Sequence, residues 1–415
     1  MPFSSRVRLA EGEPSSRNGG VAAVSKPSPE LWLARTFLGA LGNPPVRLAL
    51  WSGDSVCPTD TEPVATVRLR DRRSLLRLMY NPELEFGEAY TDGRLQVDGD
   101  LVCLLEALGR APAAPRASRL LRRPRRAHTN TLRGSRDNIH RHYDLSNEFY
   151  RLWLDERMVY TCAYFPTPTA SLEEAQLAKM EHVCRKVGLR PGDRVVEAGC
   201  GWGALALYMA RQHGVFVRAF NISHEQIVYA REQARAQRLS DRVEFIEDDY
   251  RNVSGHYDAF VSVGMLEHVG LDHFDELGRV IDGCLASHGR GFLHSIGRNA
   301  PDHLNAWIEK HIFPGAYPPS LREMLTVLEP YGFSVLDLEN LRLHYAATLR
   351  HWLARFERAT DRVASMFDDR FVRAWRLYLA GSVAAFSMGS LQLFQVSFAR
   401  RSNNDIPWTR AHLYQ

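Results

Sequence analysis

A short strand, a glycine loop and a helix follow one another directly near the middle of the chain. The apolar run 194–198 leads into the sequence Gly-Cys-Gly-Trp-Gly at residues 199–203, and the residues from Ala204 onward have a helical pattern. Glycines allow a tight turn and a close approach of the backbone to a ligand, and the first N–H groups of a helix add hydrogen-bond donors. This order of elements predicts a cofactor site at the end of a strand.

The residues around the loop narrow the class of cofactor. No Lys-Ser or Lys-Thr pair completes a phosphate-binding loop, which argues against nucleotide triphosphate hydrolysis. A hydride-transfer dinucleotide site needs an acid about 20 residues after the glycines, and Asn221 stands there instead. The next strand ends in acids and an aromatic residue, Asp248, Asp249 and Tyr250, which suit an adenine. This arrangement resembles the class I S-adenosylmethionine-dependent methyltransferases.

Helical segments alternate with short β-rich runs after residue 136, which is typical of an α/β fold with a mostly parallel sheet. The resemblance implies a Rossmann-like domain with seven strands over residues 136–415. A helix is predicted from the capping box of Ser171 and Glu174 to Gly188. The final hundred residues have a helical pattern. Five strands are expected, at residues 194–198, 215–220, 243–246, 259–263 and 291–295.

Three further segments precede this domain. Residues 1–30 are rich in Ser, Gly and Pro and predict a flexible tail. Residues 31–108 predict a small α/β domain with a strand at 64–69. Residues 109–135 predict a basic linker, because the stretch from Arg110 to Arg136 holds nine arginines, three prolines and no acid.

Five motifs, in the same order along the chain, make the resemblance specific. They are Tyr160-Thr161-Cys162-Ala163-Tyr164-Phe165, the glycine loop with Glu197, Asn221-Ile222-Ser223-His224-Glu225-Gln226, Asp249-Tyr250-Arg251, and Ser262-Val263-Gly264-Met265-Leu266-Glu267-His268-Val269-Gly270. Over residues 135–400 the chain resembles the cyclopropane-fatty-acyl-phospholipid synthases. Residues 86–95 resemble the small N-terminal domain of the longer bacterial members. This second resemblance implies a membrane phospholipid as the substrate and a lipid-presenting role for residues 31–108.

The resemblance implies transfer of a methylene group from S-adenosylmethionine to the cis double bond of an unsaturated acyl chain. An alkene is a weak nucleophile, so the sulfonium must be held in line with it. The resulting carbocation needs a dry site with aromatic faces until a base removes a proton. Tyr160, Tyr164, Phe165 and Trp202 are the candidates for these faces. In the family the base is a bound bicarbonate, and the matching positions are Cys162, Glu267, His294, the backbone of Ile296, and Tyr345.

The cofactor residues follow from the same resemblance. Gly199, Gly201 and Gly203 are expected beside the methionine and ribose, Tyr160 and Thr161 beside the amino-acid end, Asn221, Ser223 and Gln226 beside the ribose, and Asp249 and Tyr250 around the adenine. Ser223 and Gln226 also have the spacing of a capping box, so a capping role stays open for them. The six cysteines include no CxxC pair and no cluster at zinc spacing, so no metal is expected.

The composition bears on where the enzyme acts. The formal net charge is +4, and no apolar segment follows the first arginines, so no secretory signal is predicted. The uncharged stretch 377–399 contains Gly, Ser and Gln, and we do not expect it to span a membrane. We expect a cytoplasmic enzyme held peripherally at the inner face of the membrane, with the bilayer surface and an unsaturated phospholipid as partners. Nucleic acid is not an expected partner, and a homodimer stays open.

Three alternatives compete with this interpretation. A different fate of the same cation would give a methyl- or methylene-branched acyl chain, which the residues above do not exclude. An RNA methyltransferase could grip its substrate with the basic linker, but Met265-Leu266-Glu267-His268 differs from the Asn/Asp-Pro-Pro-aromatic loop of the exocyclic-amine enzymes. A lipid-binding protein with a degenerate cofactor site disagrees with the intact glycine loop.

Overall fold

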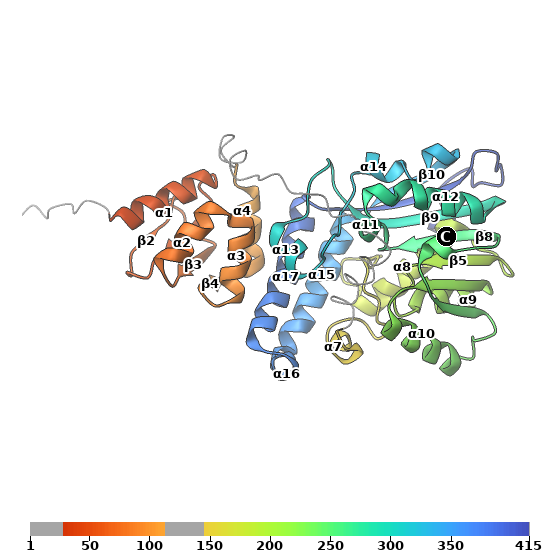
Figure 1. Ribbon diagram of the computed structural model, residues 1–415, viewed down its shortest axis with the longest axis horizontal. Coiled ribbons are helices and arrows are strands. Elements are labelled where there is room, and N and C mark those ends of the chain that lie inside the picture. Colours follow the sequence, from red (N-terminus) through yellow and green to blue (C-terminus); the bar gives the residue numbers. More distant parts are fainter. Residues whose placement is uncertain (1–27, 113–144, 415) are drawn as a thin grey trace, which may run out of the picture.

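The computed structural model describes residues 28–112 and 145–414 of the chain (Figure 1). An N-terminal domain of residues 28–112 contains a four-stranded sheet, and a C-terminal domain of residues 145–414 contains a seven-stranded sheet. In Figure 1 the two sheets lie at opposite ends of the molecule, and several helices of the C-terminal domain lie between them. The predicted tail up to residue 27 and the predicted linker from residue 113 to 135 lie outside the described residues.

The N-terminal domain packs four helices on its sheet. The strand order is β2-β1-β3-β4, with β1 parallel to β3 and the other pairs antiparallel. The predicted strand at 64–69 is confirmed as β3. The last helix, α4, runs to Arg110, two residues past the predicted domain end. The elements are α1 Pro29–Ala40, β1 Val46–Ala49, β2 Ser55–Val56, β3 Ala65–Leu69, α2 Arg72–Tyr80, α3 Pro82–Thr91, β4 Leu95–Gly99 and α4 Leu101–Arg110.

The sheet of the C-terminal domain has the order β10-β11-β9-β8-β5-β6-β7. Strands β5 to β9 are parallel to one another, and β11 is antiparallel to both β9 and β10. The prediction of a mostly parallel seven-stranded sheet is confirmed. The strands are β5 Arg194–Ala198, β6 Phe216–Asn221, β7 Val243–Glu247, β8 Tyr257–Val263, β9 Leu285–Gly297, β10 Phe333–Asn340 and β11 Gln392–Arg400.

The helix predicted from Ser171 is confirmed as α8. Ser171 accepts a hydrogen bond from the backbone of Glu174, whose side chain bonds back to Ser171, and Gly188 ends the helix in a left-handed conformation. The helices of this domain are α7 Asn147–Arg151, α8 Leu172–Val187, α9 Ala204–His213, α10 His224–Ala236, α11 Leu266–Val269, α12 Phe274–Cys284, α13 Ala306–His311, α14 Leu321–Leu325, α15 Arg342–Arg358, α16 Thr360–Met366 and α17 Asp369–Met388.

The helical pattern predicted for the final hundred residues is wrong in part. Strands β10 and β11 lie within them and belong to the main sheet. Eight of the nine residues of β11 are buried, because the strand lies between two others and under helices. A strand buried on both faces shows a continuous apolar run instead of an alternation, so its sequence cannot be told from that of a buried helix.

Helices cover both faces of the seven-stranded sheet (Figure 1). One apolar core lies between the sheet and α8, α9 and α10, and it includes Val195 of β5. The next residue, Val196, points to the other face and joins the core under α11, α12 and α14. Because helices cover both faces of the sheet, the carboxyl ends of β5, β6 and β8 are the edge where loops can form a site.

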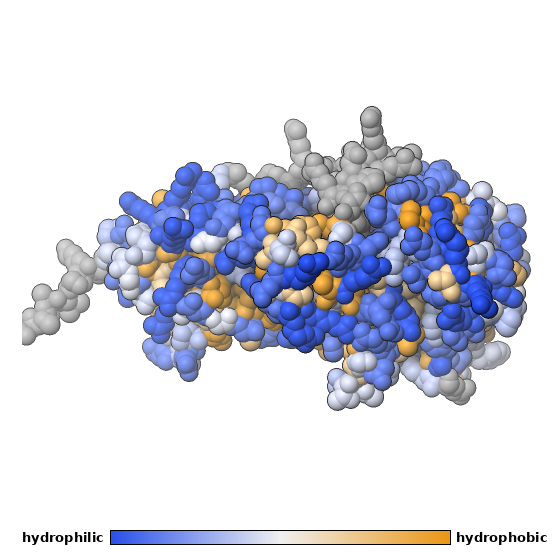
Figure 2. Space-filling view, turned by 90° about the horizontal axis from the view of Figure 1, so that it is seen from below, coloured by the Kyte–Doolittle hydropathy of each residue, from blue (hydrophilic) through white to orange (hydrophobic). Residues whose placement is uncertain are grey.

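A third apolar core joins the two domains. It runs without interruption from residues of the N-terminal domain, such as Leu38 and Leu75, to Trp352 of α15 and Leu377 of α17. Helices α3 and α4 pack on α17, and α3 also packs on α13. Figure 2 shows apolar residues gathered in the middle of one face, over the boundary between the domains. A shared hydrophobic core fixes the N-terminal domain against the C-terminal one.

Candidate active site

The glycine loop lies at the carboxyl end of β5, between this strand and α9. Gly199, Gly201 and Gly203 all have positive φ angles. A Cβ atom on Gly203 would lie 2.5 Å from the ring of Phe245, so a side chain cannot fit at the start of α9. Gly203 itself lies outside the cavity that the loop borders, and its visible role is this close packing.

A cavity at the carboxyl ends of β5, β6 and β7 brings together eight of the ten predicted cofactor residues. Ser223 lies outside its lining, is fully buried and caps α10, so its predicted contact with the ribose stays a prediction. The eight residues in the wall are Tyr160, Thr161, Gly199, Gly201, Asn221, Gln226, Asp249 and Tyr250.

The polar groups of this cavity fit S-adenosylmethionine. Among the described residues, Glu197 Oε2 and Gln226 Nε2 are buried without a hydrogen-bond partner, and both residues line the cavity. A carboxylate oxygen suits the ammonium group of the cofactor, and an amide nitrogen suits a ribose oxygen. Unpartnered buried groups are costly, so a ligand that pairs with both is favoured. Asn221 Nδ2 donates to Gln226 Oε1 at 2.7 Å and fixes the orientation of that amide.

Lys179 and Glu197 were not among the predicted site residues, yet both border the cofactor cavity. Burial lowers the pKa of Lys179 to about 8, and burial raises the pKa of Glu197 to about 8. Lys179 Nζ donates to Thr161 Oγ1 at 2.9 Å and so holds the loop before Cys162. The sequence contains only four lysines, and this rarity was the signal that could have pointed to Lys179.

A second, much larger cavity of about 1090 Å³ contains all five predicted catalytic residues in its wall. It meets the cofactor cavity at four shared residues: Tyr160, Thr161, Gly264 and His268. Gly264 has a φ of 76°, and a Cβ atom there would lie 2.9 Å from the Thr161 methyl group. A side chain at position 264 would therefore crowd Thr161 at the place where the two cavities meet.

Glu267 lies on the short helix α11, directly after β8, and only 6% of the residue is exposed. Its Oε2 accepts a hydrogen bond from Ser295 Oγ at 2.9 Å, and its Oε1 accepts one from the backbone of Ile296 at 3.5 Å. Burial raises the pKa of Glu267 to about 7, although these hydrogen bonds oppose the shift. The group can therefore accept or donate a hydrogen bond near neutral pH.

His294 lies on β9 opposite Gln395 of β11. Burial lowers the pKa of His294 well below its usual range, so the ring is neutral. The amide nitrogen of Gln395 lies 3.1 Å from His294 Nδ1. Because an amide nitrogen only donates, Nδ1 accepts and the ring proton resides on Nε2. The pairing of β9 with β11 thus provides a neutral imidazole with a defined donor.

Cys162 and Tyr345 complete the predicted set. Cys162 is fully buried, and burial raises the pKa of its thiol far above the usual value. The sulfur is therefore a thiol at neutral pH and a poor nucleophile. Thr348, one turn after Tyr345 on α15, accepts a hydrogen bond from the backbone of Ala163 at 3.0 Å. This bond holds the Cys162 segment against α15.

The four aromatic residues predicted near the cation divide into two pairs. Tyr160 lines both cavities, and its hydroxyl lies 2.7 Å from that of Tyr378 on α17, while Trp202 lines the cofactor cavity. Tyr164 and Phe165 line neither of these two cavities, so their place beside the cation stays a prediction. Their rings stack on histidines that include His344, at centroid distances of 4.9 and 6.4 Å.

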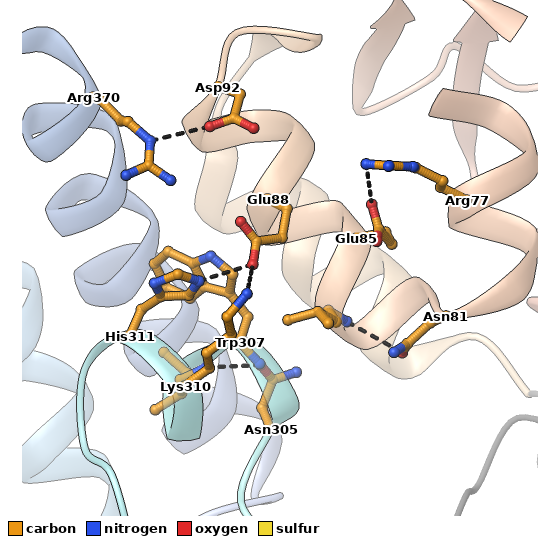
Figure 3. A network of polar contacts seen from close by, with 12 residues as sticks. Arg77, Asn81, Glu85, Glu88, Asp92, Asn305, Trp307, Lys310, His311 and Arg370 are labelled. Atoms are coloured by element: carbon orange, nitrogen blue, oxygen red, sulfur yellow. Dashed lines mark hydrogen bonds and ion pairs between the residues drawn. The ribbon is translucent and has the colours of Figure 1, made fainter. Parts of the chain in front are cut away.

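The N-terminal domain holds one wall of the large cavity. Glu88 of α3 accepts hydrogen bonds from Lys310 Nζ at 2.6 Å and from His311 Nε2 at 2.9 Å, both on α13 (Figure 3). A Cβ atom on Gly87 would lie 2.3 Å from the ring of Trp307, which lines the cavity. The 86–95 motif therefore places α3 directly against α13.

Comparison with known proteins identifies the family. Residues 130–396 match the family model of mycolic acid cyclopropane synthetases. The chain belongs to this family. Residues 33–114 match the model of a domain of unknown function. The predicted family resemblance is confirmed, and the protein is an S-adenosylmethionine-dependent methyltransferase of the cyclopropane synthase family.

Two relatives illustrate the range of this family. A Pseudomonas putida protein named "Probable fatty acid methyltransferase" is 34% identical over 89% of this chain and 96% of its own length. The cyclopropane-fatty-acyl-phospholipid synthase of Escherichia coli K12 is 40% identical over 64% of this chain and 68% of its own length.

Solved structures of the family resemble the C-terminal domain. The cyclopropane synthase MmaA2 from Mycobacterium tuberculosis has a TM-score of 0.61 at 27% identity, over 64% of this chain and 98% of that one. The mycolic acid cyclopropane synthase CmaA1, solved with S-adenosylhomocysteine (SAH) and CTAB, has a TM-score of 0.60 at 27% identity, over 63% and 97%.

Two searches of the described residues bear on the site and its surroundings. Within residues 28–112 and 145–414, no group of His, Cys, Asp and Glu side chains is arranged to hold a metal ion. None of the described helices is both long enough and apolar enough to cross a bilayer.

Proposed function

We propose that this protein transfers a methylene group to the cis double bond of an unsaturated acyl chain in a membrane phospholipid, forming a cyclopropane ring. The observation that supports this most directly is the junction of a cofactor cavity with a large apolar cavity at Tyr160, Thr161, Gly264 and His268. A long apolar substrate can reach the cofactor there without water between them.

Bound S-adenosylmethionine supplies the methyl group, and a bound bicarbonate ion supplies the proton acceptor. Glu267, His294 and the backbone of Ile296 offer the mixture of donors and acceptors that a small oxyanion needs. Because burial keeps Cys162 a thiol, its sulfur is a far weaker nucleophile toward a carbocation than a thiolate would be. Tyr160 and Tyr378 present aromatic rings at the junction, which tolerate positive charge.

The association with a membrane belongs to the same proposal. We propose that the enzyme is cytoplasmic and binds the inner face of the membrane peripherally, with the bilayer and an unsaturated phospholipid as its partners. The gathering of apolar residues over the domain boundary supports such a contact (Figure 2).

A direct test uses vesicles of a cis-monounsaturated phospholipid and S-adenosylmethionine with a labelled methyl group. The acyl chains are released afterwards and compared with standards by chromatography and mass spectrometry. We expect the label in a cyclopropane ring. Label in a soluble acceptor alone would refute the phospholipid substrate.

The role of bicarbonate is tested with Glu267→Gln. The variant should turn over about 100- to 10,000-fold more slowly, because a well-placed proton acceptor contributes that much. Cofactor affinity should change little. Bicarbonate removal should slow the wild type, and its return should restore the rate, whereas the variant should respond less. A wild type that is indifferent to bicarbonate removal would refute this role and favour Tyr345 or His268 as the base.

A second candidate function is the formation of a methyl- or methylene-branched acyl chain. The relative named as a fatty acid methyltransferase supports it, because that match extends over 89% of this chain. Both functions use the same cofactor cavity and the same cation. Chromatography against branched and cyclopropane standards distinguishes the products.

A further inference from the structure

The large cavity does not end at the domain boundary. Its lining continues past α13 and α17 between the helices and strands of the N-terminal domain. The apolar members of this lining that are still partly exposed belong to α1, α2, α3 and α4: Phe37, Met79, Phe86, Leu105 and Leu108. The cavity therefore reaches between the helices of the N-terminal domain, beside core residues such as Leu38 and Leu78 that are packed.

The cavity is large for a site that binds a single small ligand. Its volume of about 1090 Å³ is at the upper end of the roughly 300–1,000 Å³ that is usual for small-molecule pockets. It extends from Glu267 at one end to α1 and α4 of the N-terminal domain at the other, so it offers room beyond the reacting part of one chain.

Several polar members of the lining that are exposed or half-buried lie in two segments. Tyr80, Asn81 and Glu83 belong to the corner between α2 and α3, and His303 and Asn305 belong to the loop before α13. These segments come from the two domains, and both border the cavity. A polar headgroup can stay near water at these segments while apolar chains fill the two buried parts of the cavity.

We infer that the part of the large cavity between the helices of the N-terminal domain binds the second, non-reacting acyl chain of the diacyl lipid whose other chain reaches Glu267. This inference rests on the proposed function for the reacting chain. It assigns the domain a binding site in its interior, in addition to any contact that its surface makes with a bilayer. The continuous apolar core between the domains supports the assignment, because no polar layer separates the two parts.

The first test narrows the far end of the cavity. Leu108→Phe places a larger side chain at a partly exposed wall position of α4, whereas Leu104→Phe, one turn earlier on α4, is the matched control because Leu104 is fully buried and does not line the cavity. Phospholipids with the same cis-monounsaturated chain and a short, medium or long saturated second chain are compared as substrates.

Leu108→Phe should raise KM several-fold for the longer second chains and leave it unchanged for the short one, because the ring takes the space of the terminal methylenes. It should also keep its thermal stability, whereas Leu104→Phe should lose some, because only Leu104 is fully buried. An equal rise in KM for every lipid, or no rise at all, would overturn the inference. A rise that follows the length of the reacting chain beyond its double bond would overturn it too.

A second test does not depend on turnover. A phospholipid with a photoreactive group at the end of its second chain is crosslinked to the wild type, and the modified peptides are identified. We expect crosslinks in residues 37–41, 79–86 and 105–109, and crosslinks only in the C-terminal domain would refute the assignment. If these crosslinks form but no phospholipid is alkylated, the proposed function fails while the binding site stands.

Discussion

Replacement of Glu267 by glutamine should change the pH dependence of stability as well as the rate. The carboxyl group is 6% exposed, and burial raises its pKa to about 7 in the folded protein, against 4.5 for an unperturbed group. Between these two values the unfolded chain has lost this proton and the folded chain has kept it. The contribution of Glu267 to the free energy of unfolding of the wild type therefore falls as the pH rises from about 4.5 to about 7.

The size of this effect follows from the shift. One pKa unit corresponds to about 1.4 kcal/mol, so a shift from 4.5 to about 7 contributes about 3 kcal/mol. Glu267→Gln keeps the shape of the protonated group and removes the titration. Relative to the wild type, the variant should therefore gain about 3 kcal/mol between pH 4.5 and pH values above about 7.

The assay is denaturant unfolding of both proteins in bicarbonate-free buffer at pH 5 and at pH 8. The difference between variant and wild type isolates Glu267 from other groups that titrate in the same range. Glu225→Gln, at an exposed carboxylate of α10, is the matched control for the loss of one charge. If the difference between Glu267→Gln and the wild type is the same at both pH values, the carboxyl is not desolvated as described.

Two further predictions concern the domain boundary and the membrane. Gly87→Ala should cost about 1 to 3 kcal/mol of stability and lower lipid turnover but spare cofactor affinity, because the new Cβ atom would overlap the ring of Trp307. Thermal unfolding and cofactor titration check this prediction. Gly39→Ala is the control and should be tolerated, because the nearest atom to its Cβ would lie 3.8 Å away. Neutralising Arg122, Arg123, Arg125 and Arg126, which lie outside the described residues, should weaken binding to anionic vesicles by up to about 4 kcal/mol and flatten its salt dependence, at about 1 kcal/mol per charge. Unchanged binding in a vesicle sedimentation assay would refute the role of this cluster.

The accuracy of the sequence predictions follows from how local each signal is. Strand β5 was predicted with its exact bounds, because the glycines end it sharply, and the capping box of Ser171 fixed the start of α8 in the same way. Strand β9 was predicted for residues 291–295 and extends over Leu285–Gly297, since its first half lacks a continuous apolar pattern. Strand β11 was missed because its burial on both faces removes the alternation that marks a strand.

The cofactor cavity and the large cavity also differ in how local their sequence signals are. The cofactor residues lie in short motifs after neighbouring strands, so the sequence order alone places most of them together. The large cavity is lined by segments from both domains that are far apart in the chain, and each of them looks like ordinary core. Leu48 and Leu78 show no sequence signal that would distinguish a cavity wall from a packed interior.

An acyl chain that leaves a bilayer for the large cavity passes from one hydrocarbon environment to another. Both surround the chain largely with apolar groups, so the transfer gains little of the roughly 0.8 kcal/mol per methylene that burial from water would provide. Loading and unloading of such a chain are then close to a balanced partition between two apolar phases. A product that differs by one carbon returns to the membrane about as easily as the substrate left it. The apolar wall thus favours rapid exchange of many lipids over tight retention of one.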